Sequence, residues 1–424
     1  MRIRIEGRNP LQGSYMPSGS SNSAQALTAA ALMADAPVTL HNFPTTLSTT
    51  SMLHQAEAMG VTITRQANPT SLTIHAGQIT RRTIEQGENE ASVGALLFLA
   101  PMLLRRGFAR LELDYPLNRI RTHLEALRDL GLDILVNNGA VDIKAAAWEK
   151  RDIILTQTSV TATAIVMMLA ARMGRETIIQ NAASEPHIQE LGHLLLDMGA
   201  HIEGIGSSVL TIHGVDALQG AQASIAADHV EAASIAAMCA ITGGRMQING
   251  ISSRPMRLIA KIYQRIGITL ELDNDALYVP RHDILTVSNR EEDVDASIET
   301  APWPGFPSDL VAVATVIATQ ARGTSLIHEK LFSNRLLFVD KLKAMGAQIV
   351  LCDPHRAIVI GASRLRGIYM DTPDVRAGLG MVAAALCAER ETVIDNAQAL
   401  NHTFGDVLTK LQAVGANIQI EQPA

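Results

Sequence analysis

The hexapeptide DMGAHI at residues 197–202 ends a helix-like stretch, and its pattern of apolar–Gly–x–x–apolar occurs six times in the chain. The other copies are AMGVTI at 58–63, DLGLDI at 129–134, RIGITL at 265–270, AMGAQI at 344–349 and AVGANI at 413–418. Successive glycines of the pattern lie 68 to 79 residues apart. Recurrence at such a period indicates one supersecondary unit that is copied along the chain. We therefore expect a fold built from six similar units.

The unit that contains DMGAHI shows which elements to expect. Residues 159–173 have the length and composition of a helix, and residues 176–182 (ETIIQNA) have those of a strand. Residues 187–200 place their apolar side chains on one helical face and end at Gly199, which suits a left-handed C-cap. Residues 201–215 are typical of a hairpin. The predicted order is helix, strand, helix and hairpin.

The first helix of each unit is apolar on nearly every side. These helices are predicted at 24–33, 91–104, 160–173, 230–241, 309–321 and 375–388. Helices of this kind are buried, so we expect sheets and the second helices to surround them. At 424 residues the chain fits two domains of three units each. The fold class is therefore α/β (α+β), and residues 1–10 are predicted to form a short edge strand and a turn.

Composition and charge exclude several classes of function. The net charge of −7, without a basic run, argues against a nucleic-acid partner. The longest apolar run, at 93–104, is interrupted by Pro101 and is too short to span a membrane. The three cysteines have no metal-binding spacing and fit a reducing compartment. We expect a cytoplasmic protein with no secretory leader, no membrane partner and no metal.

The starts of the first helices are the expected place for function. If the three first helices of a domain run parallel, their positive N-terminal ends gather on one side and two such sides form an anion-binding cleft. The segments before these helices are 18–23, 88–92, 157–163, 227–234, 300–310 and 371–378.

Several of these segments resemble those of the enolpyruvyl transferases, and the cell-wall branch of that family more than the shikimate branch. TAPWPGFPSDL at 300–310 is the most specific match, and the other matches cover most of the chain. They are LQGSYMPSGSSN at 11–22, QNAASEP at 180–186, FSNRLLFVDKLKAMGA at 332–347 and DVRA at 374–377.

The resemblance implies a two-domain inside-out α/β barrel, with residues 1–20 plus 228–424 in one domain and 21–227 in the other. The family moves the enolpyruvyl group of phosphoenolpyruvate onto a hydroxyl and releases phosphate, without a cofactor. We expect phosphoenolpyruvate and UDP-N-acetylglucosamine, or another nucleotide acceptor, as the binding partners.

The resemblance also assigns catalytic roles. Asp309 matches the aspartate that faces the acceptor hydroxyl as base or hydrogen-bond partner, although an aspartate after Pro307 also suits a helix N-cap. Arg376 matches the arginine that binds the phosphoenolpyruvate carboxylate. Asp114 is a candidate substitute for the family's proton donor.

Other matched residues are expected to bind substrate. Asn22 matches an asparagine that contacts the sugar, with a turn or cap residue as the alternative. Arg335 matches an arginine near the acceptor, with a solvent-facing residue on the second helix as the alternative. Ser159 and Val160 stand where a Ser-Val-Gly loop holds the nucleotide, with Thr161 in place of the glycine. Glu185 and Asp228 are either at the cleft edge or in capping and pairing roles.

Four departures from the family pattern concern the phosphate end of the site. Ser21 replaces a lysine, and Glu90 replaces an arginine. The loop LDYPLNRIR at 113–121 is short and lacks the family's cysteine, which is the residue that fosfomycin alkylates. Arg119 or Arg121 is expected to stand in for the arginine of that loop. Three functions stay open: the family reaction, transfer to a different acceptor, and ligand binding without catalysis.

Overall fold

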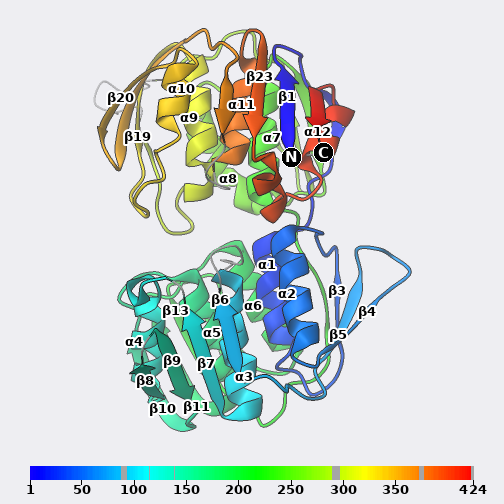
Figure 1. Cartoon of the computed structure of the whole chain (residues 1–424), viewed down its shortest axis with the longest axis vertical. Coiled ribbons are helices and arrows are strands. Elements are labelled where there is room, and N and C mark those ends of the chain that lie inside the picture. Colours follow the sequence, from blue (N-terminus) through cyan, green and yellow to red (C-terminus); the bar gives the residue numbers. More distant parts are fainter. Residues whose placement is uncertain (87–92, 114, 138, 289–296, 372–376, 422–424) are drawn as a thin grey trace. The chain divides into compact units, whose positions relative to one another are not determined.

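The computed structural model describes residues 1–86, 93–113, 115–137, 139–288, 297–371 and 377–421. The chain forms two compact units, one of Met1–Ser18 with Ala227–Ala424 and one of Gly19–Ala226 (Figure 1). Each unit is described separately below. We refer to them as the terminal unit and the central unit.

Six four-stranded sheets cover the two units. In the central unit, the strand order of the first sheet is β14 (Gln222–Ser224), β3 (Val38–His41), β5 (Leu72–His75) and β4 (Thr62–Arg65). The order of the second sheet is β6 (Thr83–Gln86), β7 (Phe108–Leu113), β9 (Ala140–Lys144) and β8 (Asp133–Asn137). The order of the third sheet is β10 (Trp148–Ile154), β11 (Gly174–Gln180), β13 (Val209–His213) and β12 (His201–Glu203). In the terminal unit, the strand order of the first sheet is β2 (Gln12–Tyr15), β15 (Arg245–Asn249), β17 (Ala276–Val279) and β16 (Glu271–Leu272). The order of the second sheet is β18 (Ser297–Glu299), β19 (Gly323–His328), β21 (Arg356–Gly361) and β20 (Gln348–Asp353). The order of the third sheet is β22 (Tyr369–Asp371), β23 (Glu391–Asp395), β1 (Arg2–Glu6) and β24 (Asn417–Glu421).

All six sheets have the same topology. The first strand in each order is parallel to the second, and the remaining neighbours are antiparallel. The predicted strand is therefore confirmed in each unit, and the predicted hairpin in five of the six. The parallel strand was not predicted, because five of these six strands have only three or four residues, and the longer β10 (WEKRDII) has no clear apolar alternation.

The prediction of an edge strand at the N-terminus is wrong. β1 lies inside its sheet, with Ile3 opposite Ile394 of β23 and Ile5 opposite Ile418 of β24. Ile3 and Ile5 are fully buried. β1 thus takes the place of the second hairpin strand in the sixth unit, and the two ends of the chain complete one repeat.

The chain passes from one unit to the other twice, and the strand just before each passage, β2 or β14, pairs within the unit that the chain is leaving. β2 leads into helix α1 (Ser21–Ala31) of the central unit, yet it pairs with β15 of the terminal unit. β14 leads into helix α7 (His229–Ile241) of the terminal unit, yet it pairs with β3 of the central unit. The segments 18–20 and 226–228 therefore join a strand of one unit to an inner helix of the other.

The inner helices form the core of each unit, as predicted. In the terminal unit α7, α9 (Val311–Gln320) and α11 (Gly378–Cys387) pack against one another (Figure 1). In the central unit α1 packs against α3 (Leu99–Arg106) and against the 3-10 turn η2 (Val93–Phe98), and α5 (Val160–Met173) packs against both. Nearly all described side chains of these helices are buried. The all-round apolar pattern has this consequence because no face is left for solvent.

The second helices carry one buried face. They are α2 (Leu47–Ala58), α4 (Arg121–Asp129) and α6 (Pro186–Asp197) in the central unit, and α8 (Ser253–Arg265), α10 (Val339–Ala344) and α12 (Val407–Ala413) in the terminal unit. None of the helices in the described ranges is long and apolar enough to cross a membrane.

The six glycines of the repeated hexapeptides all have a left-handed backbone. Their φ angles are +96° at Gly60, +93° at Gly131, +101° at Gly199, +91° at Gly267, +102° at Gly346 and +104° at Gly415. A side chain is disfavoured in this region, whereas glycine adopts it without cost. The predicted left-handed glycine at the end of the second helix is therefore confirmed: Gly199 directly follows the C-cap residue Met198, and a glycine of this kind turns each second helix into the strand after it.

Candidate active site

The proline-rich stretch 300–310 places Asp309 just before an inner helix. Residues Ser308–Leu310 form the 3-10 turn η4, and α9 begins at Val311 rather than at the predicted residue 309. The N-cap positions of η4 and α9 are Pro307 and Leu310. Asp309 therefore does not cap either element, which removes the structural alternative that the sequence left open.

Asp309 instead forms an ion pair with Arg335. The Nη1 atom of Arg335 donates to Oδ1 of Asp309 at 3.0 Å. The Arg335 side chain is buried and lies over the Phe332 ring at 4.7 Å, whereas the Asp309 side chain is 46% exposed. Arg335 is thus not the solvent-facing residue of the alternative interpretation. A fixed cation holds one carboxylate oxygen and leaves the rest of the group accessible.

Glu329 connects the two chain segments that carry this ion pair. It follows strand β19 and is fully buried. Its Oε1 atom accepts hydrogen bonds from the Thr300 hydroxyl and from the amides of Leu331 and Phe332, and its Oε2 atom accepts from the Ser308 hydroxyl. A buried carboxylate with donors on both oxygens meets the requirement for charge in an apolar interior.

His229 lies close enough to Asp309 for the charge of the carboxylate to influence the pKa of the imidazole. It is the first residue of α7, and its ring meets the Trp303 ring edge-on at a centroid distance of 5.7 Å. Burial lowers the pKa of His229 to about 4, and the nearby Asp309 charge only partly opposes this. His229 is therefore a neutral imidazole at physiological pH. The preceding residue, Asp228, caps α7 by accepting from the amides of Val230 and Glu231.

A second buried carboxylate lies next to the first crossing of the chain. Glu231 accepts from the Tyr15 hydroxyl at 2.7 Å and from the Ser18 amide at 3.2 Å, and Lys410 approaches it at 3.4 Å. Burial raises the pKa of Glu231 to about 7 against the opposing effect of Lys410. The Lys410 ammonium also donates to the Ser18 hydroxyl at 2.5 Å.

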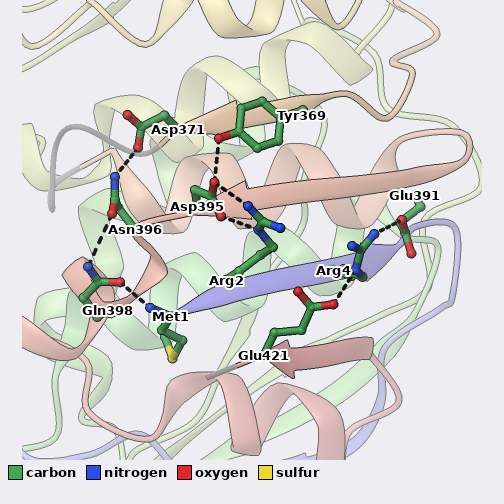
Figure 2. A network of polar contacts seen from close by, with 10 residues as sticks. All are labelled: Met1, Arg2, Arg4, Tyr369, Asp371, Glu391, Asp395, Asn396, Gln398 and Glu421. Carbon is green, nitrogen blue, oxygen red and sulfur yellow. Dashed lines mark hydrogen bonds and ion pairs between the residues drawn. The ribbon is translucent and has the colours of Figure 1, made fainter. Parts of the chain in front are cut away.

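Side chains from β22, β23, β1 and β24, which belong to one sheet of the terminal unit, form a polar network (Figure 2). Arg2 binds Asp395 through two nitrogens at 2.5 and 3.0 Å, and the Tyr369 hydroxyl donates to the same carboxylate. The hydrogen bond from Arg2 lowers the pKa of Asp395 to about 2. Asn396 donates to Asp371, the last residue of β22, at 2.7 Å. A cavity of about 390 Å³ is lined by Met1, Arg2, Tyr369, Asp371, Asp395, Asn396 and Glu421.

In the central unit, Ser21 and Asn22 lie in the first turn of α1, which Ser20 caps. Ser21 is buried and donates to the Thr46 hydroxyl at 3.3 Å, at the N-cap of α2. Asn22 is exposed. The hydroxyl of Ser21, which the resemblance places where the family has a lysine, thus faces the start of a neighbouring helix.

Ser159 and Val160 start α5. The Ser159 hydroxyl caps the helix by accepting from the Ala162 amide at 3.3 Å, and Val160 is half-buried. Thr161, which the resemblance places at the family's glycine, forms a 2.6 Å hydrogen bond with Nε2 of His123 on α4. His123 is only 7% exposed, and burial lowers its pKa to about 4. Its neutral ring therefore fixes the threonine at the helix start.

The remaining candidates of the central unit lie on nearby helix starts. Arg119, in the 3-10 turn η3 (Leu117–Ile120), is exposed and lies over the Tyr115 ring at 5.6 Å. Arg121 begins α4 and pairs with Glu125 at 2.9 Å while staying 78% exposed. Glu185 occupies the N-cap position of α6 before Pro186. Glu90, Asp114 and Arg376 lie outside the described residues.

Sequence reasoning missed His229, Glu329 and the partner of Thr161. His229 directly follows Asp228 at a predicted helix start, so its position was a usable signal. Glu329 is an acidic residue three positions before the FSNR segment at 332–335. Nothing local marks His123 as the partner of Thr161, because 38 positions separate the two residues.

The profile of the family described as EPSP synthase (3-phosphoshikimate 1-carboxyvinyltransferase) matches residues 5–411. UDP-N-acetylglucosamine 1-carboxyvinyltransferase of Bradyrhizobium diazoefficiens is 38% identical over 419 residues, covering 98% of this chain and 97% of that protein. The protein of the same name from Treponema denticola is 38% identical and covers 99% of each chain.

Solved structures show the same fold. The enolpyruvyl transferase NikO from Streptomyces tendae has a TM-score of 0.86 at 23% identity, with 99% of this chain and 98% of that chain covered. EPSP synthase from Acinetobacter baumannii has a TM-score of 0.77 at 16% identity, with 99% and 100% covered. The expected inside-out α/β barrel is confirmed. The chain belongs to the EPSP synthase family of carboxyvinyl, or enolpyruvyl, transferases.

Proposed function

We propose that this enzyme transfers the enolpyruvyl group of phosphoenolpyruvate to a hydroxyl of UDP-N-acetylglucosamine, as a step in the making of peptidoglycan precursors. The full-length relatives that carry the name of this activity support the acceptor. The observation that carries the proposal is the carboxylate of Asp309, which Arg335 holds at 3.0 Å and which stays 46% exposed.

The reaction needs a proton acceptor and a proton donor. The acceptor oxygen bonds to C2 of phosphoenolpyruvate while C3 gains a proton, which gives a tetrahedral adduct. Loss of a proton from C3 and of phosphate from C2 then restores the double bond. Asp309 takes or orients the proton of the attacking hydroxyl, because its free oxygen can accept a hydrogen bond. Asp114 is our candidate for the proton donor at C3.

Cations are required for the phosphate and the carboxylate. We assign Arg376 to the phosphoenolpyruvate carboxylate and Arg119 or Arg121 to the phosphate. Arg119 is the stronger candidate of the two, because Arg121 already pairs with Glu125. Each lost charge-assisted hydrogen bond costs about 1.5–3 kcal/mol, so Ser21 and Glu90 in place of two cations weaken phosphate binding.

Further residues are assigned to the acceptor. In our proposal Ser159, Val160 and the start of α5 bind the nucleotide, Asn22 contacts the sugar, and Glu185 and Asp228 border the acceptor. The helix start at Ser159 supports this assignment, since unpaired amides at a helix N-terminus attract a diphosphate. UDP-sugars and phosphoenolpyruvate are metabolites of the cytoplasm, where we place the protein.

One observation favours a second candidate, transfer to a different nucleotide or hydroxyl acceptor. Thr161 adds a side chain at the helix start where the family has glycine, and His123 fixes it there. A Cβ at that point restricts how closely a diphosphate approaches the backbone.

An acceptor screen tests both candidates. Purified protein is incubated with phosphoenolpyruvate and a panel of UDP-sugars and other hydroxyl compounds, and released phosphate is measured. Turnover with UDP-N-acetylglucosamine supports the first candidate, and turnover with another acceptor alone supports the second. Calorimetry that detects nucleotide-sugar binding without any turnover would instead identify a ligand-binding protein that has lost catalysis.

A further inference from the structure

Glu329 is a buried charge with no place in the reaction described above. Its side chain has 0% exposure, and four protein groups donate hydrogen bonds to its carboxylate. Burying a carboxylate is unfavourable unless its oxygens are hydrogen-bonded. Such a residue must therefore organise the groups that donate to it.

The donors come from two segments that are far apart in sequence. The first segment is the proline-rich stretch, which supplies the hydroxyls of Thr300 at 3.0 Å and Ser308 at 2.6 Å. The second is the turn after β19, which supplies the amides of Leu331 at 2.8 Å and Phe332 at 3.1 Å. One carboxylate thus ties both segments together with four hydrogen bonds.

Each segment delivers one member of the Asp309–Arg335 ion pair. Ser308 is the residue before Asp309, and the Phe332 ring lies 4.7 Å from the Arg335 guanidinium. Between Phe332 and Arg335 the chain turns through Asn334, whose φ of +64° is left-handed. Movement at Glu329 would therefore displace both Asp309 and Arg335.

The backbone of Glu329 is fixed as well. The Glu329 amide donates to the His355 carbonyl at 2.8 Å, and Nδ1 of His355 lies 2.8 Å from the Glu329 carbonyl oxygen. Thr300 is also held from the other side, because its hydroxyl accepts from the Lys330 amide at 2.9 Å. The carboxylate is therefore presented from a rigid position.

We propose that Glu329 is a positioning residue that sets the geometry of the Asp309–Arg335 pair for enolpyruvyl transfer. The inference rests on the proposed function of Asp309. Catalytic groups that are misplaced by about 1 Å can lose on the order of 100-fold in rate, so a clamp of this kind has a measurable effect.

The test uses Glu329→Gln and Ser308→Ala, each alone and together with Asp309→Asn. An amide can accept on only one side, so Glu329→Gln cannot serve both segments as the carboxylate does. We expect kcat to fall about 10- to 100-fold in the wild-type background while KM for phosphoenolpyruvate changes less than about threefold. In the Asp309→Asn background the further loss should be below about threefold, because the effect passes through Asp309.

Ser325→Ala is the matched control for Ser308→Ala, because Ser325 is a buried hydroxyl on β19, the strand before Glu329, without a partner among the described residues. We expect its kcat to stay near that of the wild type. Equal losses from Glu329→Gln with and without Asp309 would show a merely structural role and overturn the proposal. An unchanged kcat in Glu329→Gln would overturn it too.

Hydrogen exchange measured by mass spectrometry tests the clamp without any activity. Peptides over residues 300–310 and 329–337 should both exchange faster in Glu329→Gln, and neither should change in Ser325→Ala. Faster exchange in only one peptide, or in neither, contradicts the clamp.

If the wild type transfers no enolpyruvyl group, the function assigned to Asp309 fails while this measurement still decides the role of Glu329. Ser308→Ala, which keeps the Glu329 carboxylate, provides the same comparison if Glu329→Gln does not fold.

Discussion

The guanidinium of Arg335 binds the carboxylate of Asp309 with 3.0 Å between Nη1 and Oδ1, across 26 positions of the chain. Because Arg335 is buried and Asp309 is half-exposed, the pair presents a carboxylate to solvent from a fixed cationic support. This geometry is what a group that accepts the proton of a substrate hydroxyl requires. It is also the geometry on which our first prediction depends.

Asp309→Asn should lower kcat for enolpyruvyl transfer by about 100- to 10,000-fold, because the amide cannot accept the proton. Stability should change by less than about 1 kcal/mol, since the pair is only partly buried. Steady-state kinetics and denaturant unfolding measure the two quantities. Asp283→Asn, which removes an exposed aspartate–arginine pair of the same unit, should change neither. A rate within threefold of wild type would exclude Asp309 from proton transfer.

Glu231 predicts a specific pH dependence of stability. Its pKa is raised from 4.5 to about 7 by burial, with Tyr15, Lys410 and Asp228 facing it. The folded state therefore holds a proton that the unfolded state releases between these values, and stability falls as pH rises through that window. The loss is on the order of 3 kcal/mol above pH 7.

Glu231→Gln isolates this effect. The variant should gain stability relative to wild type as pH rises from 5 to 8, and the gain should level off above about pH 7. The histidines with lowered pKa values act in the opposite sense but are present in both proteins, so their contributions cancel in the difference. Glu271→Gln, an exposed carboxylate of the same unit, is the control. A difference that is constant with pH, measured by urea unfolding, would show that Glu231 is already ionised at pH 5.

Thr161→Gly should lower the free energy of unfolding and should let the acceptor approach the backbone at the start of α5 more closely. Loss of the 2.6 Å hydrogen bond leaves Nε2 of buried His123 without this partner, at a cost of about 1–3 kcal/mol. Removal of the side chain opens the backbone, so KM for UDP-N-acetylglucosamine should fall. Thr161→Ser keeps the hydroxyl and should change neither quantity strongly. A raised KM in Thr161→Gly would mean that the threonine itself binds the acceptor.

The cysteines predict resistance to fosfomycin. Cys239 and Cys387 are buried, and burial raises the pKa of each thiol to about 12, so neither forms a reactive thiolate near neutral pH. Cys352 is exposed on β20. Iodoacetamide should therefore label Cys352 without loss of transfer activity, and fosfomycin should form no adduct. A stoichiometric fosfomycin adduct in intact-protein mass spectra would contradict this.

The repeat made most of the fold predictable. The glycine that ends each second helix needs a left-handed backbone, and this local requirement recurs wherever the unit recurs, as at Gly199 and Gly415. The pairing of β1 between β23 and β24 was not predictable, because an N-terminal strand carries no sign of the distant strands it joins. The pairings of β2 with β15 and of β14 with β3 have the same cause.

Only those site residues that lie in short segments resembling the family could be predicted from the sequence. Asp309 and Arg335 came from a resemblance of short segments, and the structure brings them together. Glu329 contacts Thr300 across 29 positions and His123 contacts Thr161 across 38 positions, so no local pattern shows these two contacts. Burial of Ser21 against Thr46 likewise follows from packing between two helices and not from the sequence around it.

The most direct test of the central claim is the product formed from phosphoenolpyruvate and UDP-N-acetylglucosamine by the purified protein. We predict enolpyruvyl-UDP-N-acetylglucosamine and phosphate in equal amounts by mass spectrometry and phosphate assay, with the signal lost in Asp309→Asn. Folded wild-type protein that yields neither product with this acceptor would contradict the account.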